Sequence, residues 1–182
     1  MILRLALLLV AAAGLLASGC ATQHGGDGAL DQALAASHRS TENRARDPYR
    51  HPGETLQFFG LRPDMTVVEV WPGGGWYTEI LAPLLKDRGR LYAAQLDPAA
   101  SEYARRTVDD FRAKLAARPD LYDKVVVTAL AAPPAGNEIA PAGSADLVVT
   151  FRNLHNWMMF GWQREAFAIW RSEERRVGKE CR

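Results

Sequence analysis

The chain has 182 residues, with 22 lysines and arginines against 21 aspartates and glutamates, so its formal net charge is +1. This balance lacks the basic excess of nucleic-acid-binding domains, and we expect no nucleic acid as a partner. No cluster of histidines and acids has metal-ligand spacing, so the sequence predicts no metal site. The length suffices for one domain with its own core.

The N-terminus has the pattern of a targeting segment. An apolar run from Leu5 to Leu16 follows Arg4 and is too short to span a bilayer. The small residues before Cys20 resemble a bacterial lipobox, which implies removal of residues 1–19 and a lipid anchor on Cys20. The alternative is an ordinary secretory signal. In either case we expect an exported protein, on the periplasmic side of a membrane as a lipoprotein or in the periplasm, with 20–28 as a tether.

The next elements lead to a glycine-rich loop. Residues 29–46 are predicted to form a helix ended by Asp47-Pro48, and 54–59 a short helix stopped by Gly60. The β-branched run at 66–71 predicts a strand, which a glycine loop at 72–75 and a helix at 76–86 follow. Such a junction directs backbone N–H groups and the positive end of a helix dipole at one place, where a nucleotide-like ligand can sit.

Three further strands are predicted, at 90–96, 124–130 and 146–151. Helices are expected at 101–117 and 157–170, and a Pro/Gly/Ala loop at 131–144. In the first helix we expect Tyr103, Val108, Phe111 and Leu115 to face inward; in the second we expect Met158, Met159 and Trp162 in the core. Strands that alternate with helices predict an α/β fold, a Rossmann-like doubly wound parallel sheet.

The last segment, 171–182, has no apolar periodicity. It resembles the translation of a sequencing adapter, and we interpret it as a non-native tail; a native charged tail is the alternative. The domain at 29–170 would then be incomplete, with its sheet truncated after about four strands.

The glycine loop excludes two common ligand classes. A phosphate-binding P-loop needs a lysine followed by serine or threonine, and this loop has none. A dinucleotide fingerprint needs a third glycine where the chain has Thr78. What remains is Glu69 on the first strand, the glycine turn, and Asp97 at the end of the second strand. This arrangement suits a ligand with a ribose and an amino-acid part, because a carboxylate accepts hydrogen bonds from ribose hydroxyls.

These residues resemble the class I S-adenosylmethionine-dependent methyltransferases. Glu69, Gly73 and Gly75 match the first motif of that superfamily, and Asp97 matches its ribose-binding acid. Residues 46–60, 69–83 and 151–157 are similar to a group of exported bacterial predicted methyltransferases. The resemblance covers roughly 40–165. It implies S-adenosylmethionine as cofactor, with the binding residues Glu69, Trp71, Gly73, Gly74, Gly75 and Asp97.

Several of these positions allow a second interpretation. Trp71 replaces the first motif glycine, and Pro72 is expected to hold it extended; its indole either stacks on a ligand or fills the core. Glu69 could serve only the loop N–H groups, and Asp97 could be a helix N-terminal acid. No acid follows the third strand, so adenine recognition would be apolar or backbone-mediated.

Residues after the fourth strand are candidates for catalysis. Methyltransferases place acceptor-side groups there, so His155 is a candidate general base and Asn153 a candidate amide ligand of the acceptor. The alternative is a loop in which Asn156 caps the next helix and His155 packs.

The sequence therefore predicts methyl transfer from S-adenosylmethionine to a small-molecule or unknown acceptor. S-adenosylmethionine is made in the cytoplasm, which the protein is expected to leave. That motivates a second hypothesis, a non-catalytic envelope lipoprotein that binds a small ligand with the same fold, and a third, a purely structural lipoprotein.

Overall fold

A computed structural model describes residues 27–133 and 138–173. Its strands are β1 (Thr66–Val70), β2 (Arg90–Leu96), β3 (Val125–Leu130) and β4 (Leu147–Thr150). They form one parallel sheet in the order β3-β2-β1-β4. The order reverses at β1, so the point between β1 and β4 is the switch point where ligands of such sheets bind. The signal segment, Cys20 and most of the predicted tail lie outside the described residues.

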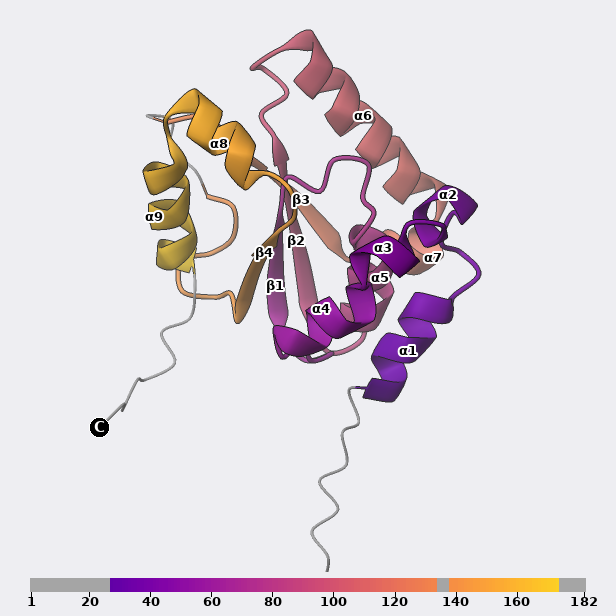
Figure 1. Cartoon of the computed structure of the whole chain (residues 1–182). Coiled ribbons are helices and arrows are strands. Elements are labelled where there is room, and N and C mark those ends of the chain that lie inside the picture. The colour runs from indigo at the N-terminus through magenta and orange to yellow at the C-terminus, as the bar shows by residue number, and fades with distance from the viewer. Residues whose placement is uncertain (1–26, 134–137, 174–182) are drawn as a thin grey trace, which may run out of the picture.

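Helices cover both faces of the sheet (Figure 1). Those before β1 are α1 (Asp27–Ala35), α2 (Thr41–Arg44), α3 (Asp47–Arg50) and α4 (Pro52–Phe58). The later ones are α5 (Thr78–Leu85), α6 (Glu102–Ala117), α7 (Pro119–Tyr122), α8 (Leu154–Phe160) and α9 (Gln163–Glu173). None of the described helices has the length and apolar character to cross a bilayer. The predicted α/β, doubly wound parallel fold is confirmed.

The core has two halves because β1 is buried on both faces. Val67 packs into the half formed with α1, α4, α5 and α6. Val68 and Val70 point to the opposite half, which contains Trp157 of α8, Trp162 between the two helices, and Ala166 and Trp170 of α9. Such an apolar strand is typical of parallel sheets whose two faces are covered.

The single helix predicted at 29–46 is wrong. The chain leaves α1 after Ala35, and α2 begins only at Thr41. Arg39 turns inward and donates to both carboxylate oxygens of Asp47, at 2.6 and 2.8 Å. Ser40 then caps α2, since its Oγ accepts from the Asn43 N–H at 3.1 Å. The predicted helix is thus interrupted where the buried Arg39 guanidinium reaches the Asp47 carboxylate.

Two other helix predictions need correction. Tyr103 is 70% exposed, and Ala104 takes its place on the buried face of α6, because 104, 108, 111 and 115 have the spacing of one helical face. The helix expected at 157–170 is two helices, interrupted at Gly161 with φ of 76°. This break leaves Met158 and Met159 exposed while Trp162 is buried as predicted. The helix α9 continues past Trp170 to Glu173.

Candidate functional site

Two hollows lie at the carboxyl ends of the strands, one on each side of Trp71. The larger, the Asp97 cavity, has a volume of about 800 Å³ and is lined by Trp71, Gly73, Leu96, Asp97, Ala100, Ser101, Tyr103, Ala104, Thr107, Leu130, Ala132, Pro133, Asn153, Asn156, Phe160 and Trp162. The smaller, the Glu69 cavity, has about 230 Å³ and is lined by Asn43, Arg46, Arg50, Glu69, Val70, Trp71, Pro72, Gly74, Trp76, Tyr77 and Phe151.

The glycines of the loop have different roles. Gly73 and Gly75 have φ values of 58° and 76°, which side chains rarely adopt. A Cβ on Gly75 would also lie 2.9 Å from Cε2 of Phe111, so Gly75 lets α6 pack against the loop. A Cβ on Gly73 or Gly74 would meet nothing within 4 Å. The backbone conformation therefore requires a glycine at position 73. Neither the conformation nor the available space requires one at position 74.

Two side chains that the sequence analysis missed hold the carbonyls of this loop. Gln95 is buried in β2 and donates from Nε2 to the Gly73 carbonyl at 2.7 Å. Lys114 of α6 donates to the Gly74 carbonyl at 2.8 Å and pairs with the buried Glu79 at 2.8 Å. A polar glutamine within the otherwise apolar end of β2 is the sequence feature that could have identified Gln95 as a residue that binds the loop. These contacts fix the loop to β2 and α6.

Trp71 does not have the extended conformation that Pro72 was expected to impose. Its φ is 51°, in the left-handed region that is costly for a residue with a Cβ. Its N–H donates to the Ala94 carbonyl at 2.7 Å, and its indole Nε1–H to the Leu130 carbonyl at 3.2 Å. Its ring packs 5.4 Å from that of Trp157 and 5.6 Å from that of Trp162. Trp71 is thus both a core contact and the wall between the two cavities.

Glu69 lies in the smaller cavity and is almost completely buried. The Thr78 hydroxyl of α5 donates to its Oε2 at 2.6 Å. Burial raises the pKa of Glu69 to about 7, opposed in part by the Thr78 hydrogen bond and by the charge of Lys114. The carboxyl group therefore changes its protonation state near neutral pH.

Asp97 lines the larger cavity at the end of β2. Its Oδ1 accepts from the Ala99 N–H at 2.9 Å, which shapes the turn into α6. The N-cap of α6 is Ser101, whose Oγ accepts from the Ala104 N–H at 3.0 Å. Asp97 is therefore not the cap of this helix, and its carboxylate faces a cavity whose other walls are largely apolar.

Asn153 and His155 lie differently with respect to the cavities. The Asn153 amide donates to the Val70 and Trp71 carbonyls at 3.2 and 3.3 Å and to the Thr150 hydroxyl at 3.0 Å. It thereby ties the end of β4 to the end of β1 while lining the Asp97 cavity. His155 is exposed on α8 and lines neither cavity. Asn153, rather than Asn156, occupies the N-cap position of α8.

The structure thus gathers the predicted site residues into two groups. Trp71, Gly73, Asp97 and Asn153 meet at the Asp97 cavity. Glu69, Trp71 and Gly74 meet at the Glu69 cavity. Gly75 and His155 line neither of them.

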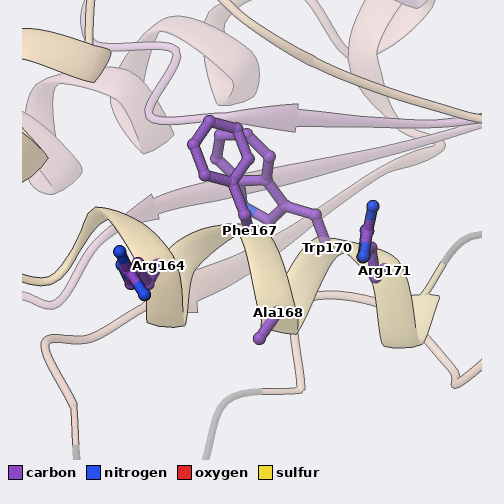
Figure 2. Close-up of a pocket in the computed structure, with 5 residues that line it drawn as sticks. All are labelled: Arg164, Phe167, Ala168, Trp170 and Arg171. Atoms are coloured by element: carbon purple, nitrogen blue, oxygen red, sulfur yellow. The ribbon is translucent and has the colours of Figure 1, made fainter.

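Other candidate sites in the described part of the chain have fewer polar groups that could bind a ligand. A hollow of about 670 Å³ runs along α9 (Figure 2), and its lining residues, Arg164, Phe167, Ala168, Trp170 and Arg171, all come from that one helix. In the residues that the structure describes, no second element brings a polar group to it. Among the described residues, no group of three histidines, cysteines or acids could hold a metal ion.

The comparisons with known proteins point to one fold. The chain is 28% identical over 121 residues to the protein-L-isoaspartate O-methyltransferase of Aeropyrum pernix, a match that covers 53% of this chain and 46% of that protein. Its structure resembles the crystal structure of an S-adenosylmethionine-dependent methyltransferase from Aquifex aeolicus, with a TM-score of 0.51 and 20% identity over 68% of this chain and 57% of that one. No family model matches the chain.

The structural likeness establishes the fold as that of a methyltransferase, as the sequence predicted. The chain spans about half the length of the proteins it matches.

The buried Glu69 predicts a pH dependence of stability. Its folded-state pKa of about 7 lies above the ordinary value of 4.5, so the folded protein keeps a proton that the unfolded chain releases. Its contribution to the free energy of unfolding is present below pH 4.5 and is lost as the pH rises to about 7, by roughly 3 kcal/mol. Glu69→Gln removes this titration and keeps an acceptor for Thr78.

We therefore expect the stability of Glu69→Gln relative to the unmodified protein to increase between pH 4.5 and 7, measured by urea unfolding. Asp110→Asn, at an exposed position of α6, is the matched control and should give a constant difference. If the difference in free energy of unfolding between Glu69→Gln and the unmodified protein is also constant with pH, the raised pKa of Glu69 is contradicted.

Proposed function

We propose that the Asp97 cavity binds S-adenosylmethionine and that the protein transfers its methyl group to an acceptor. The observation that carries this proposal is the meeting of Gly73 and the Asp97 carboxylate in one cavity beside the switch point of the sheet. The methyltransferase fold and the relative from Aeropyrum pernix support it.

The residues of the cavity fit this cofactor. A volume of about 800 Å³ falls within the usual range for small-molecule sites, roughly 300–1,000 Å³. The Asp97 carboxylate can accept hydrogen bonds from ribose hydroxyls, and a Cβ at Gly73 would enter open space, so the backbone there can approach a ligand closely. Leu130, Ala132 and Pro133 offer an apolar wall for adenine, in place of an acid after β3.

When bound, S-adenosylmethionine supplies a methyl group on a sulfonium, which is open to direct attack by a nucleophile. The chain contributes orientation, which alone can lower a barrier substantially. Asn153 holds the ends of β1 and β4 together, and Trp71 separates the two cavities. His155, the candidate base, lies on the exposed side of α8, so it can serve only an acceptor that extends over that helix.

A non-catalytic, ligand-binding role is the second candidate function. Two observations favour it: Trp71 occupies a glycine position of the motif, and His155 lines neither cavity. In that case the protein binds S-adenosylmethionine or a related nucleoside without transferring a methyl group. When the protein is incubated with envelope extract and S-adenosylmethionine that carries a tritiated methyl group, the label should stay on the cofactor. Transfer of the label to any component of the extract excludes this candidate.

We also propose that the protein is exported and anchored to a membrane through a lipid on Cys20, with a periplasmic location if the signal is an ordinary one. The apolar run at 5–16 and the small residues before Cys20 support this proposal. An exported enzyme would need a supply of cofactor outside the cytoplasm.

Asp97 provides the direct test of the cofactor site. Asp97→Ala removes the acceptor for ribose hydroxyls, and loss of hydrogen bonds to a charged group should weaken binding of S-adenosylhomocysteine about tenfold or more. Isothermal titration calorimetry measures this affinity. Asp110→Ala removes an exposed acid of α6 that lines neither cavity and should leave the affinity unchanged. Equal affinities in the two variants would sink the assignment of Asp97.

Lipidation makes a separate prediction. In a bacterial host given radiolabelled palmitate, the unmodified protein should incorporate the label and sediment with membranes. Cys20→Ala should lose the label, because no other cysteine lies near the predicted cleavage site. Cys181→Ala is the matched control and should keep the label. Label retained in Cys20→Ala refutes the anchor.

A further inference from the structure

The Glu69 cavity has cationic groups without anionic partners. Arg46 and Arg50 line it, and both guanidinium groups lie over the Trp76 ring, at 5.8 and 5.0 Å from its centroid. Stacking on an aromatic face holds a guanidinium in place while leaving its N–H donors free for a ligand. The indole of Trp76 is itself fixed, because its Nε1–H donates to the Asn43 carbonyl at 2.7 Å.

Charge in the cavity is uncompensated. Within the described part of the chain, neither Arg46 nor Arg50 forms an ion pair with a carboxylate, whereas Arg39, 6.0 Å from the same ring, is paired with Asp47. The one acid among the lining residues is Glu69, whose carboxyl group accepts the Thr78 hydroxyl. Burial and the positive charges of Arg46 and Arg152 lower the pKa of Arg50, so an anion in the cavity would relieve this repulsion.

The cavity suits a small planar anion. Its volume of about 230 Å³ is well below the 800 Å³ of the Asp97 cavity and admits a carboxylate on a short or aromatic carbon skeleton. Trp76, Tyr77 and Phe151 supply apolar walls, with the Tyr77 and Phe151 rings stacked at 3.5 Å. The fork of a guanidinium matches a carboxylate in geometry as well as in charge.

We propose that Arg46 and Arg50 bind the carboxylate of the methyl acceptor, which makes the acceptor an anionic small molecule or an anionic group of a larger one. This inference rests on the proposed function, because it places the acceptor across Trp71 from the cofactor. Trp71 lines both cavities, so ligands in the two would both contact its indole, and methyl transfer requires them to meet past the edge of that ring.

Arginine-selective NMR tests the proposal. The protein is labelled with ¹⁵N-arginine, saturated with S-adenosylhomocysteine, and titrated with sodium benzoate, or with benzamide as the neutral probe of the same shape. We expect benzoate, and not benzamide, to shift the Nε–Hε signals of Arg46 and Arg50 in a saturable way. Arg46→Gln and Arg50→Gln should each weaken benzoate binding about tenfold. Each should leave the affinity for S-adenosylhomocysteine within about twofold of its starting value.

Arg44→Gln is the matched control, since Arg44 is exposed in the same segment and lines neither cavity. Arg46 is also exposed, so its substitution spares the core, and far-UV circular dichroism checks the fold of all three variants. The proposal is overturned if benzoate does not bind, if Arg44→Gln weakens binding equally, or if S-adenosylhomocysteine competes with benzoate. Competition would mean that the arginines hold the amino-acid carboxylate of the cofactor. Absence of S-adenosylhomocysteine binding, with benzoate binding intact, would instead reject the proposed function and with it the acceptor role.

Discussion

The site depends on how the chain leaves β1 at Trp71. A tryptophan in the left-handed region is held there by the Ala94 and Leu130 carbonyls and by the rings of Trp157 and Trp162. These contacts come from β2, β3, α8 and the link between α8 and α9, so the shape of the loop depends on both the sheet and its covering helices. The cost of the backbone conformation is on the order of 1–3 kcal/mol, which such packing can offset. The indole then divides the space above the strands in two.

The two resulting cavities differ in electrostatic character. The Asp97 cavity offers one carboxylate among apolar walls, whereas the Glu69 cavity offers guanidinium groups beside an acid whose pKa is raised toward neutrality. Lys114 of α6 holds the loop that runs past both cavities, because it donates to the Gly74 and Gly75 carbonyls and pairs with the buried Glu79. The two sides of Trp71 therefore differ in the charge of the ligand group that they favour.

Local patterns were enough to predict the sheet and the loop. The β-branched runs and their flanking glycines and prolines located all four strands of the described chain, and Gly73 and Asp97 line one cavity at the carboxyl ends of these strands. Interactions between distant residues were not predictable in this way. The break after α1 depends on Arg39 reaching Asp47, and the loop depends on Gln95 and Lys114, which lie 22 and 40 residues from the carbonyls they bind. The exposure of His155 follows from how α8 rests on the sheet.

We propose that the cavity between Gly73 and Asp97 binds S-adenosylmethionine. A crystal structure of the protein grown with saturating S-adenosylhomocysteine tests this proposal. We expect ligand density in that cavity, with the ribose hydroxyls on the Asp97 carboxylate and the adenine against Leu130 and Pro133. Ligand bound elsewhere, or a cavity that contains only solvent at saturation, would contradict it.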